Sequence, residues 1–166
     1  MRSELTYIYW DSCVFLSYVA AIAERISVLD ALLDQVQHDR NRKLITSSIA
    51  IAEVAFASGH GRPKRRPRHI EDRIDELWNA PFIELVEVNR PILYRARTLM
   101  REGLDRGLRL KPYDAVHLAT AAWVNENISS VDEIHTYDGD FRAFEELIGI
   151  SIVEPYINQP PLLNEE

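Results

Sequence analysis

Short apolar runs alternate with helical patterns along most of this chain. The first run, Tyr7 to Trp10, is apolar and β-prone, as expected of a strand buried on both faces. Further short runs predict strands at 44–46, 82–88, 133–137 and 151–153. Because strands that alternate with helices form parallel sheets covered on both faces, the pattern predicts an α/β fold with a mainly parallel central sheet.

Apolar residues at helical spacing predict the helices between these strands. Short helices are expected at 15–23, after a cap at Ser47 or Ser48, and at 70–79. The helix predicted at 23–38 has one apolar face: Ile26, Leu29, Leu32, Leu33 and Val36. The best-defined helix begins at Asn89-Arg90-Pro91 and ends at Gly107. Its apolar stripe comprises Ile92, Leu93, Ala96, Leu99, Met100 and Leu104.

Composition indicates an ordinary globular protein. A length of 166 residues suits one domain with a real core, and a net charge of −7 means that the surface as a whole does not attract nucleic acid. The single cysteine excludes an internal disulfide and agrees with a reducing compartment. Asp11 interrupts the apolar stretch from Leu5 to Ala23, which argues against a signal peptide. We therefore expect a cytoplasmic protein with no membrane partner.

Asp11 ends the first apolar run, and Ser12 follows it. Open α/β sheets bind their ligands at the carboxyl ends of strands, where this carboxylate should lie. Aspartate and serine are also good helix caps, so either residue could serve only to cap the next helix. Three further acidic positions favour a site.

Glu53 is one of these positions. Its neighbours at helical spacing, among them Ile49 and Phe56, are apolar, so Glu53 projects from an apolar face. A buried carboxylate must be paired, protonated or bound to a metal. A structural salt bridge is the alternative to a role in a site.

Asp114 lies just after Pro112, in the expected first turn of a helix over 110–123 that is apolar nearly all round. The positive end of a helix is by itself a sufficient reason for an acidic residue there. His117 follows one turn later on the same side and could reach the same site, although a hydrogen-bonded core histidine is the favoured interpretation.

Asp138 and Asp140 follow the strand that starts near Glu133. Asp138-Gly139 is a natural turn and Asp140 a natural helix cap. In a parallel sheet these residues share an edge with Asp11. Four carboxylates from distant segments would repel one another unless cations lie between them. Such an oxygen-rich site suits Mg²⁺ or Mn²⁺, and a metal pair of this kind serves phosphodiester hydrolysis.

The segment 59–69 is basic, with two prolines and two glycines that deny it regular structure. It holds five of the chain's 19 basic residues: Arg62, Lys64, Arg65, Arg66 and Arg68. Such a run suits contacts with substrate phosphates. An exposed loop that pairs with the acidic residues after it is an equally good interpretation.

Four segments of the chain resemble the signature regions of PIN-domain ribonucleases, the family of the VapC toxins of toxin–antitoxin pairs. They are Asp11-Ser12 after an apolar strand, Glu53 in S-S-I-A-I-A-E-V, Asp114 in D-A-V-H-L-A-T-A, and T-Y-D-G-D-F around Asp138. The resemblance spans roughly Tyr7 to Val153. It implies a PIN-like three-layer sandwich with a central sheet of about five strands, and metal-dependent cleavage of RNA.

By this resemblance, the catalytic and metal-binding acids are Asp11, Glu53, Asp114 and Asp138, with Asp140 as an auxiliary metal ligand and Ser12 beside the substrate. It implies an RNA substrate, an antitoxin partner and a homodimer. We expect a PIN-like domain over 1–154, with 59–69 as a basic insertion and 155–166 as a loosely held C-terminal extension. Cys13 departs from the family, which more often has a small polar residue there.

Other functional classes fit less well. A phosphatase of the haloacid-dehalogenase type needs a second aspartate where Cys13 stands. A cysteine hydrolase using Cys13 and His117 would leave Glu53 and Asp138 unexplained. The stronger alternative is a PIN-like module that binds RNA or a protein without cutting.

Overall fold

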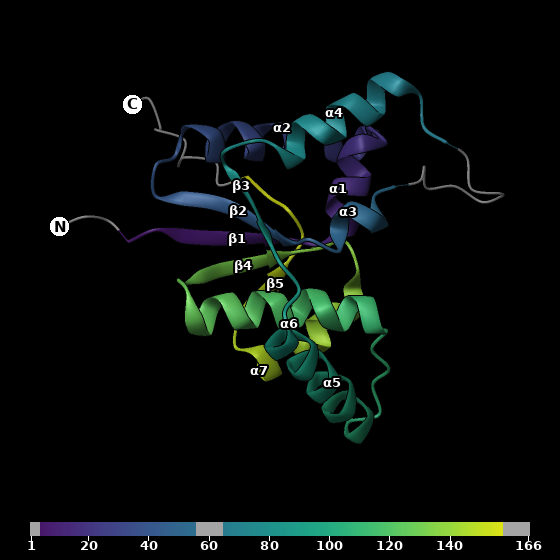
Figure 1. Ribbon diagram of the computed structural model, residues 1–166, viewed down its shortest axis with the longest axis vertical. Helices are drawn as coiled ribbons and strands as arrows, with labels where there is room; N and C mark the ends of the chain where they lie inside the picture. The colour runs from purple at the N-terminus through teal and green to yellow at the C-terminus, as the bar shows by residue number, and fades with distance from the viewer. Residues whose placement is uncertain (1–3, 56–64, 158–166) are drawn as a thin grey trace, which may run out of the picture.

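A five-stranded, fully parallel sheet forms the centre of the computed structural model, which describes residues 4–55 and 65–157 (Figure 1). Its strand order is β3-β2-β1-β4-β5. The strands are β1 (Thr6–Trp10), β2 (Arg42–Ser47), β3 (Ile83–Val86), β4 (Val131–His135) and β5 (Ser151–Val153). The predicted parallel α/β sheet is confirmed.

Helices cover both faces of the sheet and complete three layers (Figure 1). On one side lie α1 (Ser12–Val19), α2 (Ala23–His38), α3 (Ala50–Glu53) and α4 (Arg68–Trp78). On the other side lie α5 (Arg90–Asp105), α6 (Pro112–Asn127) and α7 (Glu145–Ile148), the last preceded by the 3₁₀ helix η1 (Gly139–Phe144).

The central strand β1 supplies both layers of the core. Successive side chains of a strand point to opposite faces. Ile8 and Trp10 pack with the apolar residues of α1, α2 and α4, whereas Tyr7 and Tyr9 pack with those of α5 and α6. All four side chains are buried, which explains why this run is apolar without alternation.

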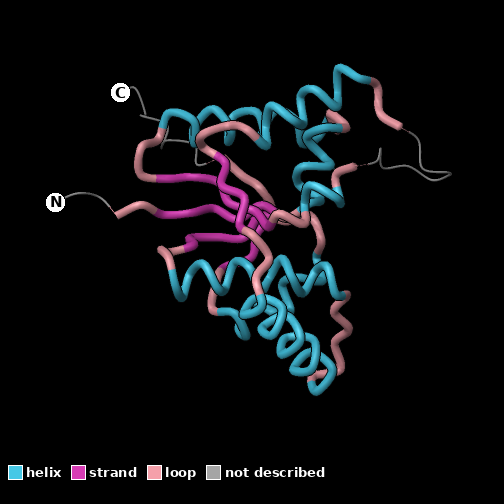
Figure 2. The backbone as a smooth tube through the Cα atoms, viewed as in Figure 1, coloured by secondary structure: helices cyan, strands magenta, loops and turns pink. Residues whose placement is uncertain are grey.

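The carboxyl ends of β1, β2 and β4 meet near the middle of the molecule, where their loops gather (Figure 2). Trp10 pairs with His135, so Asp11 and Thr136 follow their strands at the same level. Because β1 lies between β2 and β4, the segments after these three strands are brought together.

Several local predictions were wrong. Leu93 and Leu104 were assigned to the buried stripe of α5 but are 51% and 66% exposed, since no described element covers that side. No serine caps α3, whose N-cap residue is Ile49; the Ser47 hydroxyl instead accepts a 3.4 Å bond from the Ile49 backbone N–H. Helix α4 begins at Arg68, so the basic segment is helical at its end.

Membrane-spanning potential is limited in the part of the chain that the structure describes. No single helix there has the length and apolar character to cross a bilayer. Only α1 and α2 taken together meet those two criteria, and they are bent by 109° at the break between them.

Candidate active site

Asp11 is both a helix cap and a buried carboxylate. Its Oδ1 accepts hydrogen bonds from the backbone N–H groups of Cys13, at 3.0 Å, and Val14, at 3.3 Å, at the start of α1. The residue is only 3% exposed. Burial raises the pKa of the Asp11 carboxyl, against hydrogen bonds that favour its charged form. The capping interpretation is therefore correct, and it is compatible with a place in the site.

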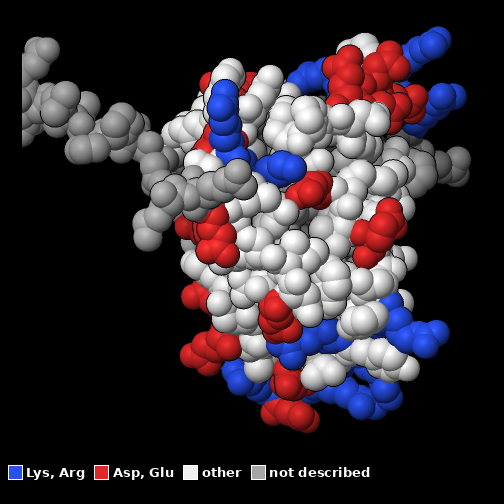
Figure 3. All heavy atoms as spheres, turned by 60° about the vertical axis from the view of Figure 1, so that its left-hand side comes forward, with Lys and Arg blue, Asp and Glu red and all other residues white. Residues whose placement is uncertain are grey.

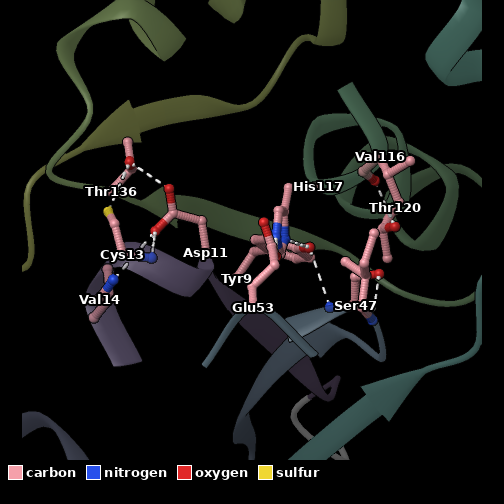
Figure 4. Close-up of polar contacts among 11 residues, drawn as sticks. Tyr9, Asp11, Cys13, Val14, Ser47, Glu53, Val116, His117, Thr120 and Thr136 are labelled. Carbon is pink, nitrogen blue, oxygen red and sulfur yellow. Dashed lines mark hydrogen bonds and ion pairs between the residues drawn. The ribbon is translucent and has the colours of Figure 1, made fainter. Parts of the chain in front are cut away.

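Thr136 connects two of the predicted acids, and Figure 4 shows its contact with one of them, Asp11. Its hydroxyl donates a 2.6 Å hydrogen bond to Asp11 Oδ2 and accepts one of 2.9 Å from the backbone N–H of Asp138. Cys13 packs at the same point, since its Sγ accepts a hydrogen bond from the Tyr137 N–H. Cys13, partly buried in the first turn of α1, thus contacts the segment that follows β4.

Asp138 caps η1 by accepting a 3.0 Å hydrogen bond from the backbone N–H of Asp140. The helix cap was expected at Asp140, which was wrong: Asp138 is the cap residue, and the 3₁₀ helix begins at Gly139. Asp138 is half-buried, whereas Asp140 is exposed. The Asp138 side chain is therefore less accessible to solvent than that of Asp140.

Asp114 lies in the first turn of α6 and is electrostatically coupled to two of the other acids. Burial raises the pKa of the Asp114 carboxyl, and the negative charges of Asp138 and Glu53 raise it further. Lys111 opposes these effects. Carboxylates from α3, from α6 and from the segment after β4 therefore share one electrostatic environment.

Glu53 is paired, as its place on an apolar face required. Its Oε2 lies 2.5 Å from Nε2 of His117, a residue that is 1% exposed (Figure 4). The other ring nitrogen of His117 lies 2.7 Å from the Tyr9 hydroxyl. His117 is therefore a hydrogen-bonded core histidine, as favoured from the sequence, and it also contacts a predicted site residue.

The predicted acids fit a divalent cation by their chemistry. Their oxygen donors are those that Mg²⁺ and Mn²⁺ prefer, and the pKa of Asp114 is raised by burial and, in addition, by like charges that a cation would neutralise. Within residues 4–55 and 65–157, however, no three His, Cys, Asp or Glu side chains form a group arranged to hold a metal ion. Glu53 is bonded to His117 and Asp11 to Thr136, so these carboxylates are oriented by protein partners.

The predicted phosphate-binding residues differ among themselves. Arg62 and Lys64 lie outside the described residues. Arg65 is exposed and pairs with Glu71 at 3.3 Å, and Arg68 is exposed at the start of α4.

Arg66 departs from the expectation of an exposed phosphate contact. It is 6% exposed, and its Nη1 donates a 2.8 Å hydrogen bond to the Val54 carbonyl just after α3. Burial lowers the pKa of its guanidinium. Its buried side chain supports the end of α3.

Sequence reasoning missed two residues that organise the site. The sequence pattern places Tyr9 only in an apolar strand and Thr136 only in the motif T-Y-D-G-D-F, and it indicates a role for neither. The signal that could have indicated Tyr9 is its hydroxyl, which lies near the end of a strand buried on both faces. Buried hydroxyls require hydrogen-bond partners.

On the face shown in Figure 3, the middle is largely uncharged with scattered acidic side chains, and Lys and Arg side chains gather towards the lower end. A pocket of about 290 Å³ lies between β3 and α6, and Tyr7, Glu84 and Trp123 are among its lining residues. None of the predicted site residues lines it.

Residues 8–147 match the family model described as PIN domain. This chain belongs to the PIN domain family. The resemblance inferred from four short motifs is thereby confirmed, as is the PIN-like sandwich fold. No curated protein sequence matches the chain.

Solved structures of VapBC proteins and of FitAcB share the fold. VapBC2 from Rickettsia felis, bound to a DNA fragment from its promoter, superposes with a TM-score of 0.64 at 12% identity, covering 89% of this chain and 98% of the other. DNA-bound VapBC from Salmonella typhimurium superposes with a TM-score of 0.61 at 14% identity, covering 90% of this chain and 98% of the other. FitAcB from Neisseria gonorrhoeae superposes with a TM-score of 0.60 at 18% identity, covering 89% of this chain and 97% of the other.

Proposed function

We propose that this PIN-domain protein is a metal-dependent endoribonuclease, the toxin of a toxin–antitoxin pair acting in the cytoplasm. The observation that carries the proposal is the coupling of Asp114 to both Asp138 and Glu53. Burial and the negative charges of Asp138 and Glu53 raise the pKa of the Asp114 carboxyl, and a bound cation would offset this cost of ionising Asp114.

Asp11, Glu53, Asp114 and Asp138 would hold Mg²⁺ or Mn²⁺, with Asp140 as an exposed auxiliary ligand. The cation would supply an activated water and neutralise charge on the leaving oxygen of an RNA phosphodiester. Ser12, half-exposed at the start of α1, lies beside Asp11 and can donate a hydrogen bond to substrate.

Positive charge for RNA binding would come from the basic segment 59–69. Arg65 and Arg68 are exposed and suit phosphate contacts, and Arg62 and Lys64 complete the proposed set. Arg66 contributes by supporting the end of α3, which carries Glu53.

The partner proposal rests on the fold. The similar solved structures include VapBC proteins and a toxin–antitoxin complex, so we propose an antitoxin protein as partner, and we further propose a homodimer. The PIN domain would span 1–154, and 155–166 would extend from it. The beginning of this extension is held, because the Tyr156 hydroxyl donates a 2.7 Å hydrogen bond to Glu133 Oε1.

Cleavage of a fluorescent RNA by purified protein tests the activity. Cleavage should require Mg²⁺ or Mn²⁺, stop with EDTA, and nearly vanish in Asp114→Asn. Expression should arrest growth, with relief by a small protein encoded next to the gene. RNA binding without metal-dependent cleavage would instead establish a non-catalytic module.

A further inference from the structure

His117 lies at the centre of a chain of hydrogen bonds that runs from the backbone of β2 to Glu53 (Figure 4). The backbone N–H of Ser47, the last residue of β2, donates to the Tyr9 hydroxyl over 3.1 Å. That hydroxyl lies 2.7 Å from His117 Nδ1, and His117 Nε2 lies 2.5 Å from Glu53 Oε2. Tyr9 and His117 are both buried.

The direction of the chain follows from what each group can donate. A backbone N–H only donates, so the Tyr9 oxygen accepts from Ser47. A tyrosine hydroxyl keeps its proton at neutral pH, so the Tyr9 O–H is a donor as well as an acceptor. Among hydrogen bonds between described residues, the acceptor for that proton is His117 Nδ1. A proton on Nδ1 would leave a buried hydroxyl without an acceptor, so the ring proton belongs on Nε2.

We infer that His117 is a positioning residue that orients Glu53 for the cation. Its Nε2–H occupies Oε2, and Oε1 is the carboxylate oxygen that we assign to the metal. This inference rests on the proposed function, because it assigns Glu53 to the metal site. Groups that hydrogen-bond a ligating carboxylate fix its orientation and raise metal affinity.

Glu53 needs such support because its own helix supplies little. Helix α3 has four residues and no side-chain cap, and Glu53 is its last residue. A long side chain at the end of a short helix loses considerable entropy when it is fixed. His117, in contrast, sits within the sixteen-residue helix α6 and is held on its other side by Tyr9.

Helix α6 therefore positions two of the acids. Asp114 precedes His117 by three residues and lies on the same side of α6. One rigid element thus carries one proposed ligand directly and orients a second through a hydrogen bond.

The test combines Mn²⁺ titration, followed by electron paramagnetic resonance, with RNA cleavage. His117→Leu should weaken Mn²⁺ binding by about 10–100-fold. His117→Gln, whose amide can still donate to Glu53, should restore most of the affinity. Tyr9→Phe keeps the histidine but removes the group that orients it, and should weaken binding by a smaller factor. Tyr7→Phe is the matched control on the same strand and face, and should bind Mn²⁺ as the wild type does.

Nitrogen-15 spectra of metal-free protein provide a readout that does not need activity. They should show His117 with its proton on Nε2, and Tyr9→Phe should alter the Nδ1 signal. Circular dichroism accompanies each titration to establish that the variant is folded, and Tyr9→Phe carries the test if His117→Leu is not.

Either of two results would overturn this inference but leave the proposed function standing. The first is an Nδ1–H tautomer of His117 in the wild type. The second is wild-type Mn²⁺ affinity in folded His117→Leu or Tyr9→Phe protein, when Asp114→Asn has lost Mn²⁺ affinity. Failure of the proposed function has a different signature. In that case wild type and Asp114→Asn would be alike in binding no Mn²⁺ and cutting no RNA, and both proposals would fall.

Discussion

The Thr136 hydroxyl donates a 2.6 Å hydrogen bond to Asp11 Oδ2 and thereby joins the carboxyl ends of β4 and β1. The same hydroxyl accepts from the backbone N–H of Asp138. One small buried side chain thus orients one proposed metal ligand and fixes the backbone of another.

Replacing Thr136 with valine tests this link. Thr136→Val keeps the shape but leaves Asp11 Oδ2 and the Asp138 N–H unsatisfied, so we expect a loss of about 1–3 kcal/mol in the free energy of unfolding. Urea denaturation measures it, and RNA cleavage should fall as well. Thr120→Val is the control, because that buried hydroxyl donates only to the Val116 carbonyl of its own helix. Equal losses of stability and of RNA cleavage in the two variants would mean that the Thr136 hydroxyl does not organise the site.

The two functions of Asp11 can be separated by substitution. Asp11→Ala removes the cap of α1 and should cost about 0.5–2 kcal/mol of stability. Asp11→Asn keeps a side-chain oxygen for the cap and should cost less. Both variants should lose RNA cleavage, because both lack the carboxylate. Thermal unfolding beside a cleavage assay checks the pair, and an active Asp11→Asn protein would remove Asp11 from the metal site.

The raised pKa of Asp114 predicts how stability depends on pH without metal. Burial and the charge of Asp138 raise this pKa in the folded protein above its unfolded value. The folded state then keeps a proton that the unfolded state has released, so the contribution of Asp114 to stability falls as the pH rises through this range and is at its lowest above the folded pKa.

Asp114→Asn should therefore match or exceed the wild type in stability at neutral pH without metal. The advantage should shrink as the pH falls to about 4, near the ordinary carboxyl pKa. Denaturation curves with EDTA over this range measure it. If Asp114 served only as a favourable helix-end charge, the substitution would instead cost about 0.3–1 kcal/mol at neutral pH.

The arginines of the basic segment should divide into two groups. Neutralising exposed Arg65 and Arg68 to glutamine should weaken RNA binding and flatten its salt dependence, because fewer counterions are released. Arg66→Gln should instead destabilise the fold by about 1.5–3 kcal/mol, since it removes a charged donor from the Val54 carbonyl. Fluorescence anisotropy at several salt concentrations and urea denaturation distinguish these effects. An unchanged salt slope in Arg65→Gln/Arg68→Gln would mean that the segment does not contact RNA.

The amino-acid pattern by itself determined the order and type of most elements. Helix α2 has the predicted bounds, and α5 begins after the Asn89 cap and ends before Gly107, which has a φ of 73°. These features depend on local chemistry: apolar spacing, a capping side chain, a proline in the first turn and a glycine in a left-handed conformation. Parallel pairing followed because the strands alternate with helices.

Only the tertiary structure decided which polar groups meet. Tyr9 lies 108 residues from His117, and Thr136 lies 125 residues from Asp11, so no local pattern could pair them. The burial of Arg66 likewise depends on packing against the residue after α3, which charge alone does not reveal. Spacing along a chain reports which face a side chain occupies. The partner across that face is set by how strands and helices pack, and here that packing places His117 between Tyr9 and Glu53.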